Sequence, residues 1–495
     1  MKEKIFGKWR NKIWPIHNFE LKKILPLFLM KFLISLNYGI LNSLKDAIIV
    51  TQKKSGAEVI PVLKGWLVLP IALIVTLIYS KLSNIFKRST LFYGIIATFL
   101  IFFLLYGFFL YPHQEILSPH KTSDLISSFI GKNHEHWTAI YRYWMHSLFF
   151  VATELWGSVI IFLLFWGFVN QVIKITEAKR FYTIFSAGGN LAAILTGPIV
   201  WHYAKKFINN KFDLTLQHLT IYIIVIGLLI MLIYFLYQKY ILPKNFYDKK
   251  IKEKAEKKTT LSLKEGFKYI AKSKYLKALS LMVICYGLII NLIETTWKAN
   301  LKLQYPNLAD YQSFMATISF FVGITSFIIA LFVGSGIIRF FGWKKSASIC
   351  PIFIGTTGII FLFLILTQKP LFFLSHLLKI SPLLIITLFG AFQNISTKAL
   401  KYSIFDPTKE MAFIPLDQES KVKGKAAIDI IGSRLGKSGS SWIQIILLDI
   451  IGTGSILSIT PLLLPIITLA AIYWIFSINR VSKKFEKLSL EKASI

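Results

Sequence analysis

Two cations stand three residues apart in an apolar part of the chain. Arg434 and Lys437 lie within "GSRLGKSG", and "SWIQIILLDII" follows shortly after. A phosphate-binding P-loop reads G-x-x-x-x-G-K-[ST] and follows a β-strand. Here only three residues separate Gly432 from Gly436, and the preceding "KGKAAIDII" is not strand-like. The spacing argues against a P-loop and favours two cations on one face of a membrane helix, with flanking glycines that let an anion approach the backbone.

Further charged residues lie inside or at the ends of apolar runs, where charge is expensive. A charge at the bilayer centre costs about 2.5–3.5 kcal/mol on insertion scales, so such a residue faces water, a partner or a substrate. The residues are Lys45, Asp46, Glu154, Glu294 and Lys298. Lys45 with Asp46, and Glu294 with Lys298, could equally be salt bridges that hold helices together. Arg434 and Lys437 have no acid within one turn except Asp429, which favours a binding role for them.

The composition indicates the kind of secondary structure on which these charges lie. Of the 495 residues, 55% are hydrophobic and 16% are charged, whereas about a quarter would be charged in a soluble chain. The mean hydropathy is +0.59. Because the apolar residues fall in long runs and a bilayer offers the backbone no water, each run should be a helix. We therefore predict an all-α polytopic membrane protein.

Twelve transmembrane helices are predicted, in two six-helix bundles with a major-facilitator-like layout. The bundles comprise residues 1–240 and 276–495, joined by a basic linker, 241–275. Because the number of spans is even and Lys and Arg gather at the flanks of one side, both termini are predicted to be cytoplasmic. The spans are expected near 24–44, 59–79, 91–111, 142–170, 182–203, 218–238, 277–297, 312–338, 347–367, 381–401, 426–450 and 457–478.

Two short echoes relate the halves. "NSLKDA" sits in the first span as "NLIETT" sits in the seventh, which places Lys45 opposite Glu294. "SAGGN" sits in the fifth span as "SRLGK" sits in the eleventh, which places Asn190 opposite Lys437. Together they suggest an internal repeat.

The formal net charge of +33 limits the possible partners. Cytoplasmic Lys and Arg beside anionic lipid explain most of this excess, and an anionic substrate is a second explanation. Nucleic-acid binding is not expected, because the basic residues are spread over many short loops. The N-terminal segment looks like neither a signal peptide nor a transit peptide, which favours a bacterial inner membrane.

No cofactor or metal site is predicted. The two cysteines lie in apolar runs and suggest no disulfide framework, and no zinc-type His/Cys spacing occurs. The loop 112–140 could bind a metal, but a solvated polar loop is the expectation for it. It contains His113, His120, His134 and His136.

Several longer stretches carry a family resemblance that runs from residue 44 to about 440. The chain resembles the non-mitochondrial ATP/ADP translocases, the nucleotide transporters of obligate intracellular bacteria and plastids. The matching stretches are "LKDAIIVT", "SGAEVIPVLKGWLVLP", "YSKLSNIFKR", "ATELWGS", "EAKRFYTIFSAGGNLA", "NLIETTWKANLKLQYPN", "FDPTKEMAFIPLD" and "KGKAAIDIIGSRLGKSG".

The resemblance implies a transporter, not an enzyme, that exchanges ATP for ADP by alternating access. It implies a lipid-embedded protein, which we expect to be a monomer. The family's important charged residues match Lys45, Glu154, Glu294 and Lys437, and a phosphate-proximal asparagine matches Asn190. We expect Lys45, Lys437, Arg434 and Asn190 at the phosphates, Glu154 and Glu294 in binding or coupling, and Asp46 and Lys298 as a gate or salt bridge.

Two alternatives stay open. The family has diverged in substrate, so a proton-coupled nucleotide or NAD importer, with Glu154 or Glu294 carrying the proton, fits the same motifs. Whether Mg²⁺ accompanies the nucleotide is also open. A lipid-modifying enzyme or a receptor would need catalytic residues clustered at an interface, and the sequence offers no such cluster.

Overall fold

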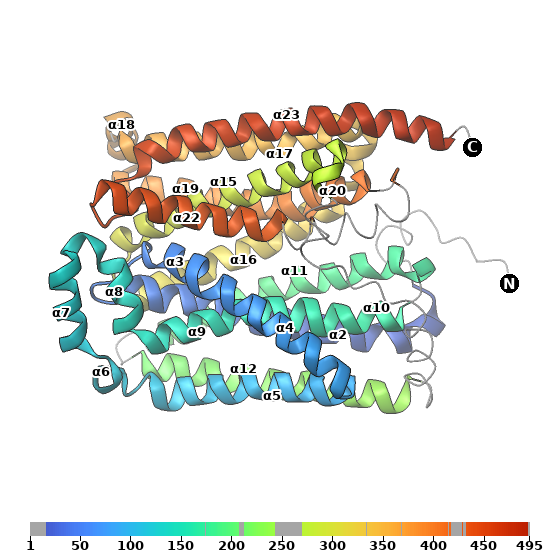
Figure 1. Ribbon diagram of the computed structural model, residues 1–495, viewed down its shortest axis with the longest axis horizontal. Coiled ribbons are helices and arrows are strands. Elements are labelled where there is room, and N and C mark those ends of the chain that lie inside the picture. The colour runs from blue at the N-terminus through green and yellow to red at the C-terminus, as the bar shows by residue number, and fades with distance from the viewer. Residues whose placement is uncertain are drawn as a thin grey trace.

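The computed structural model is helical, with long helices that lie side by side along one axis (Figure 1). It describes residues 16–173, 175–206, 212–242, 270–332, 334–367, 369–413, 415–416, 428 and 432–493. No strand occurs in these ranges, as expected where each segment must satisfy its own backbone hydrogen bonds. Apart from its two ends, the predicted linker 241–275 lies outside the described residues.

Helices of the N-terminal half come first along the chain. They are α2 (Leu21–Thr51), α3 (Val59–Val62), η2 (Leu63–Val68), α4 (Leu69–Ile85), α5 (Arg88–Leu105), η3 (Tyr106–Leu110), α9 (Trp144–Leu155), η5 (Trp156–Trp166), α10 (Gly167–Val172), α11 (Ile175–Lys206) and α12 (Asp213–Tyr240). Many of these run on without a break, so that α3, η2 and α4 form one continuous span, as do α9, η5 and α10.

Helices of the C-terminal half follow. They are α15 (Lys274–Gln304), α16 (Leu308–Phe332), α17 (Gly334–Leu366), α18 (Lys369–Leu378), α19 (Pro382–Leu400), η6 (Lys401–Phe405), α20 (Asp406–Ala412), α22 (Ser433–Ile451) and α23 (Thr460–Ala493). Gly342 interrupts the helical backbone of α17 with φ 72°, in the left-handed region that glycine adopts without steric cost.

The predicted spans agree with these helices. Ten helical segments of the described residues are long and apolar enough to cross a membrane. The two remaining predicted spans, 182–203 and 426–450, correspond to α11 and to α22, which carry more polar residues. The ten apolar segments together with α11 and α22 are consistent with the predicted twelve spans. The chain is a multi-pass membrane protein.

Several helices extend beyond the predicted apolar runs. The first span was expected to end at residue 44, but α2 continues to Thr51, and α15 continues to Gln304 rather than 297. Polar residues in these extensions, such as Lys45, Asp46 and Lys298, are buried within the bundle rather than facing lipid. The helix therefore continues where hydropathy alone suggests that it ends.

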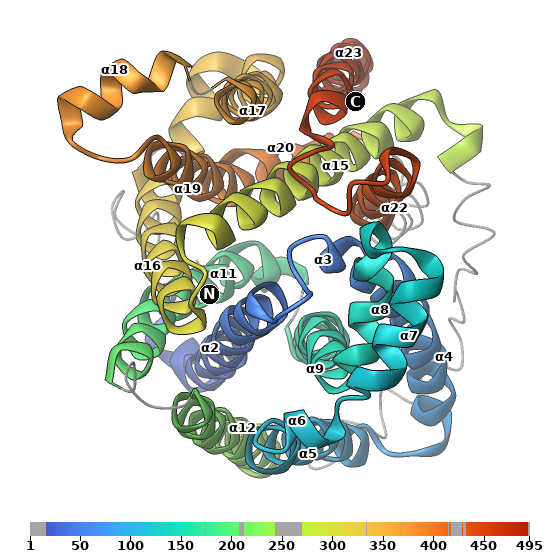
Figure 2. The same cartoon turned by 90° about the vertical axis from the view of Figure 1, so that its left-hand side faces the viewer.

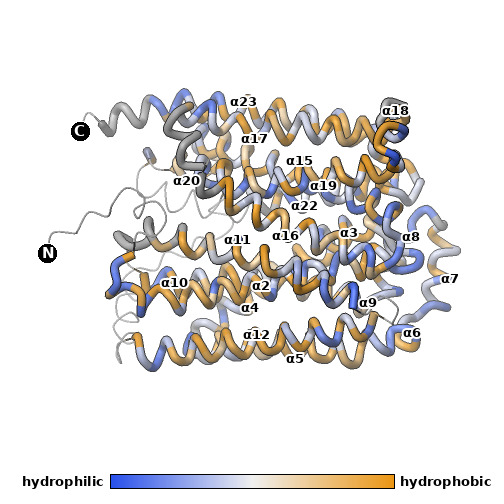
Figure 3. Tube along the Cα trace, turned by 180° about the vertical axis from the view of Figure 1, so that it is seen from behind, coloured by the Kyte–Doolittle hydropathy of each residue, from blue (hydrophilic) through white to orange (hydrophobic). Residues whose placement is uncertain are grey.

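The two ends of the bundle differ. At one end, here called the terminal end, α2 begins and α23 ends (Figure 1). The opposite end, here called the distal end, carries short helices outside the main bundle: α6 (Gln114–Leu117), α7 (His120–Ile130), α8 (Glu135–Arg142) and α18 (Lys369–Leu378). Hydrophilic residues gather on α6, α7 and α8, while hydrophobic residues dominate the long helices (Figure 3).

The segment 112–140 was expected to be a solvated polar loop; much of it is exposed, but it is helical rather than a loop. This segment folds into α6, α7, η4 (Lys132–His134) and α8. One of its histidines, His136, is buried, as is Arg142 at the end of α8. The segment folds because α8 presents a strongly amphipathic face that packs on the end of the bundle.

The two halves meet along α11 and α16, which lie side by side (Figure 2). Glycines allow the close approach. A Cβ added to Gly197 would lie 2.7 Å from the Ala316 carbonyl oxygen, and one added to Gly323 would lie 2.6 Å from the Ile194 amide nitrogen. Small residues at a membrane helix contact let backbones approach closely, so these positions require glycine.

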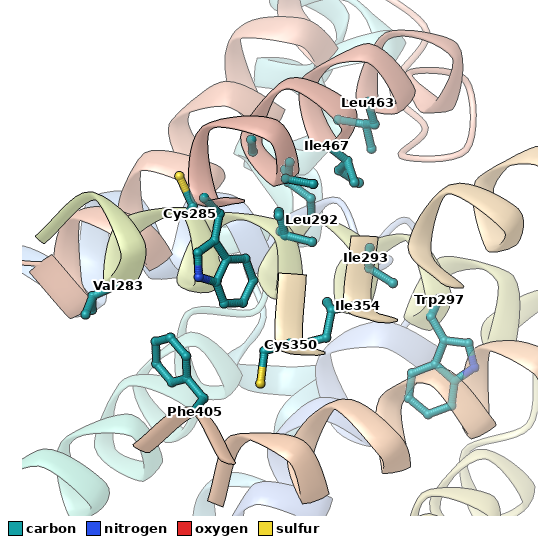
Figure 4. Close-up of a cluster of buried hydrophobic side chains, with 14 of the residues drawn as sticks. Val283, Cys285, Leu292, Ile293, Trp297, Cys350, Ile354, Phe405, Leu463 and Ile467 are labelled. Atoms are coloured by element: carbon teal, nitrogen blue, oxygen red, sulfur yellow. The ribbon is translucent and has the colours of Figure 1, made fainter. Parts of the chain in front are cut away.

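Two buried apolar clusters fill the bundle. One is built mainly from the helices of residues 16–242, and the other mainly from the helices after residue 270. Figure 4 shows part of the second cluster, where Cys285 of α15 and Cys350 of α17 lie among Leu, Ile and Trp side chains. Both thiols are free and buried, so they pack as apolar residues. The exact domain boundaries remain a prediction.

Candidate functional site

The charged residues singled out in the first span pair inside the N-terminal half. Lys45 of α2 lies 2.8 Å through its Nζ from Glu154 Oε1 and 3.1 Å from Asp46 Oδ1. Its Nζ is also 4.2 Å from the ring centroid of Phe150, on the same helix as Glu154. A desolvated ammonium over an aromatic face gains a further attraction. Lys45 thus ties α2 to α9.

A second buried lysine connects the two halves. Lys298 Nζ of α15 lies 2.9 Å from Asp46 Oδ2 and 3.2 Å from Glu294 Oε1. Lys45, Asp46 and Lys298 are exposed by only 2%, 1% and 2%. Asp46 therefore bridges a lysine of its own half and a lysine of the other half, in surroundings that exclude water.

The chain of ion pairs ends in the C-terminal half. Glu294 Oε1 also lies 3.8 Å from Nζ of Lys398, near the end of α19. The complete order is Glu154, Lys45, Asp46, Lys298, Glu294 and Lys398, which we call the ion-pair network. The side chains of Glu154 and Glu294, the two carboxylates toward the ends of the network, are each 20% exposed. Solvent therefore reaches the network at these two residues.

Two lysines beside the network have no carboxylate within 4 Å among the described residues. Lys64 of η2 donates to Asn291 Oδ1 of α15 at 2.7 Å. Asn291 in turn donates through Nδ2 to the Lys437 carbonyl oxygen at 3.1 Å and to Ser440 Oγ at 2.6 Å, both on α22. The Lys437 side chain is exposed.

The balance of charge in this region favours an anion. The eight residues are the lysines 45, 64, 298, 398 and 437 and the carboxylates of Asp46, Glu154 and Glu294. Five lysines against three carboxylates leave an excess of two positive charges. A multiply charged anion would neutralise this excess and could take over hydrogen bonds that the carboxylates now accept.

Irregular helix geometry accompanies three of these residues. Lys64 lies inside the π-helical η2, Glu154 lies two residues before η5, and Lys398 lies three residues before η6. π-Helical turns are rare and are frequent at functional sites. Each redirects the side chains near it relative to a regular helix.

Asn190 lies apart from the ion-pair network. Its neighbour Gly189 packs against α2 near Lys31 and Ser35. Ser35 precedes Lys45 by ten residues, which corresponds to about 15 Å along a helix. Asn190 therefore lies nearer the terminal end than Lys45, and a shared ligand would have to be elongated.

The backbone supports the suggested repeat. Gly189 approaches α2, and its counterpart Gly436 approaches Ile284 and Gly287 of α15, the helix that corresponds to α2 in the second half. Both glycines therefore face the first long helix of their half, although Gly436 approaches the backbone of that helix more closely than Gly189 does. Arg434 lies on α22, but its side chain is outside the part of the chain that the structure describes.

The distal end is closed by contacts between the halves. Lys302 of α15 donates to the Ser55 carbonyl oxygen, and Trp137 of α8 donates to Asp449 Oδ1 of α22 at 3.3 Å. A Cβ added to Gly65 would meet the Trp442 ring at 2.9 Å, so η2 lies directly on α22. The ion-pair network lies behind this closed layer.

Comparisons with known proteins decide the family. A family model described as the TLC ATP/ADP transporter matches residues 1–485. The chain belongs to this family. It is 43% identical to ADP,ATP carrier protein 1 of Chlamydia muridarum over 99% of this chain and 93% of that one. It is 39% identical to the chloroplastic ADP,ATP carrier protein 1 of Arabidopsis thaliana, over 97% of this chain and 77% of that one.

Further comparisons agree. The TLC-family chain is 37% identical to ADP,ATP carrier protein 3 of Rickettsia typhi, over 98% of both chains. Among solved structures it resembles a POT family transporter, with TM-score 0.56 and 12% identity over 94% of this chain and 96% of that one. It also resembles a D-xylose–proton symporter, with TM-score 0.52 and 12% identity over 92% and 97%. These two likenesses establish the fold, and the predicted major-facilitator-like architecture is confirmed.

The sequence reasoning missed three lysines of this TLC-family protein. Lys64 and Lys398 belong to the site described above, and Lys31 is buried in α2 beside Gly189. The signal was present, because Lys31 and Lys64 each interrupt an apolar run just as Lys45 does. Lys398 falls near the end of its predicted span, where a lysine is usually interfacial.

Proposed function

We propose that this protein exchanges ATP for ADP across a bacterial inner membrane, importing ATP and exporting ADP, without hydrolysing either. The single observation that carries the proposal is the buried ion-pair network with two further lysines beside it. The excess of two positive charges suits a polyphosphate, and the names of the relatives at 37–43% identity are those of ADP,ATP carriers.

Lys45 and Lys437 are proposed to hold the phosphate chain from opposite halves. Lys437 is free to do so, because no carboxylate of the described residues lies within 4 Å of it, and its backbone is fixed by Asn291. Lys45 would exchange Glu154 for a phosphate oxygen. Arg434 and Asn190 would add hydrogen bonds nearer the terminal end, with Arg434 offering a bidentate fork.

Strict exchange follows if phosphate oxygens replace the carboxylates as partners of the lysines. Without nucleotide, Glu154, Asp46 and Glu294 neutralise Lys45, Lys298 and Lys398, but Lys64 and Lys437 keep two positive charges that are costly to occlude. With nucleotide, the phosphates neutralise them, so the loaded carrier changes conformation more readily than the empty one. The halves would rock about the α11–α16 contact, with the distal end closed in the present structure and open in the alternate one.

We propose that Asp46 and Lys298 act as a gate, and their ion pair supports this role. Their 2.9 Å pair joins the halves close to the distal end, so it must break or rearrange when that end opens. Glu154 and Glu294 serve as competitors of the phosphates in this scheme. Both are paired with lysines, at 2.8 Å for Glu154 with Lys45 and 3.2 Å for Glu294 with Lys298.

The test is a chase experiment in intact bacterial cells that express the chain. The cells are loaded with α-labelled ATP, and unlabelled ADP, ATP, GTP, NAD or buffer is then added outside. Release of label by ADP and ATP, with retention in buffer, is the expected result. Uptake that ignores internal nucleotide and collapses with an uncoupler would instead identify a proton symporter and refute exchange.

A further inference from the structure

Three side chains with metal-binding chemistry meet at the distal end. They are His134 of η4, His136 of α8 and Asp449 of α22, and their ligand atoms all lie within 4.8 Å of one another. Among the described residues, no other group of three His, Cys, Asp or Glu side chains gathers in this way. Two of them come from the N-terminal half and one from the C-terminal half.

The distances fit a shared ion. His134 Nδ1 lies 3.1 Å, and His136 Nε2 lies 3.2 Å, from the same oxygen, Asp449 Oδ1. Two ligands about 2.0–2.1 Å from a tetrahedral zinc ion are separated by about 3.3 Å. Each imidazole nitrogen therefore lies almost as far from the Asp449 oxygen as it would if both atoms were ligands of one zinc ion.

His136 is the second observation that points to a ligand. Its side chain is fully buried, Nδ1 has no hydrogen-bond partner among the described residues, and Nε2 faces Asp449 Oδ1 at 3.2 Å. An unsatisfied buried imidazole is costly.

The surroundings hold these groups in place and leave a way in. Trp137 donates to Asp449, and Gly454, with φ 65°, brings the chain after α22 against the Asn133 carbonyl oxygen. His134 and Asp449 are about one-third exposed, so an ion can reach them from solvent. The site therefore has one fully buried ligand, His136, and two ligands that solvent can reach, His134 and Asp449.

We propose that His134, His136 and Asp449 form a zinc site that joins the two halves and holds the distal end closed. The site would take a divalent transition ion that favours two imidazoles, a carboxylate and a water in tetrahedral geometry. Binding requires only the closed arrangement of these residues. Because opening the distal end must separate α8 from α22, the bound ion stabilises the closed state and slows exchange.

Binding is measured first, on the purified full-length protein in detergent and without nucleotide. Titration with zinc is followed by calorimetry, for the wild type and for His134→Ala, His136→Ala and Asp449→Asn. We expect one saturable site in the wild type and a loss of affinity of about ten-fold or more in each variant. His113→Gln is the matched control, since His113 is an exposed histidine of the same segment that bonds only the Phe109 carbonyl oxygen.

Two results would overturn the proposal, and the first of them does not depend on whether the variants fold. Absence of a saturable zinc site in the wild type would do so, and so would equal zinc affinity in the wild type and in folded His136→Ala. Binding does not depend on what the protein transports, so its failure is distinct from a failure of the proposed exchange.

The consequence for transport rests on the proposed function. External zinc is added to cells exchanging labelled ATP, and initial rates are compared between the wild type, His136→Ala and His113→Gln. Complex formation between zinc and ATP affects all three equally, so only a difference between them reports the site. We expect inhibition in the wild type and in His113→Gln, reversed by a chelator, and none in His136→Ala. Equal inhibition of all three would refute the proposal that zinc at this site holds the distal end closed.

Discussion

The cross-half pair between Asp46 and Lys298 allows a quantitative prediction. Its two side chains are almost fully buried, 2.9 Å apart, and belong to different halves. A hydrogen bond to a charged group contributes about 1.5–3 kcal/mol. Removing one partner of an isolated buried pair costs about 3–5 kcal/mol. Here each residue keeps a second partner, Lys45 for Asp46 and Glu294 for Lys298, so the lower range applies.

The assay is a double-mutant cycle on the free energy of unfolding. Asp46→Asn, Lys298→Gln and the double variant are unfolded with urea in mixed micelles, and we expect a coupling energy of about 2 kcal/mol. The matched control is the pair Lys54 and Asp124, which is 2.7 Å apart but 49% and 51% exposed. Exposed pairs contribute about 0.2–1 kcal/mol.

Equal coupling in the two cycles would refute the reasoning. It would mean that burial at the centre of the bundle does not strengthen the pair, and that the network is solvated in the working protein. A large coupling only in the control pair would be still more damaging, because the bridge between the halves would then contribute nothing to stability.

Three further predictions concern binding, packing and charge movement. Glu154→Gln removes the closest competitor for Lys45, so calorimetry should find ATP bound more tightly while exchange slows; weaker binding would instead place Glu154 on the ribose or base. Gly436→Ala puts a methyl group 2.8 Å from the Ile284 carbonyl oxygen and should lower the free energy of unfolding by about 1–3 kcal/mol. Gly439→Ala is the control, because its methyl group would meet nothing within 4 Å, and thermal unfolding of the two variants checks the difference. ATP-for-ADP exchange moves about one net charge, worth about 2.3 kcal/mol per 100 mV, so imposed diffusion potentials should bias it in proteoliposomes, and indifference to potential would contradict this.

Hydropathy was enough to predict the long membrane helices, because a bilayer forces each apolar run to satisfy its own backbone. It did not predict where α2 and α15 end, or the short helices of 112–140. The same rule located most of the site. Lys45, Glu154, Glu294 and Lys298 were singled out because charge is costly at depth, and all four lie in the ion-pair network. Pairs between neighbours on one helix were also foreseeable, and Glu294 with Lys298 is observed as expected.

Contacts between helices were beyond the reach of the sequence. Nothing local indicates that Asp46 pairs with Lys298, or that Lys64 reaches Asn291, because both contacts depend on how the two halves pack. The burial of His136 was not foreseen for the same reason, since it depends on α8 packing against the bundle. The Asp449 carboxylate that His134 and His136 face is more than 300 residues away. The cytoplasmic linker at 241–275 and the phosphate-binding role of Arg434 remain predictions.

The central claim is that lysines from both halves bind the phosphates of a nucleotide. It is tested most directly by measuring the affinities of AMP, ADP and ATP for the purified wild type, Lys45→Ala, Lys437→Ala and Lys54→Ala. The account predicts that affinity rises with each added phosphate in the wild type and in Lys54→Ala. It also predicts that ATP binding weakens by about ten-fold or more, and that the rise flattens, in the other two variants. Wild-type affinities for ATP in both Lys45→Ala and Lys437→Ala would contradict it.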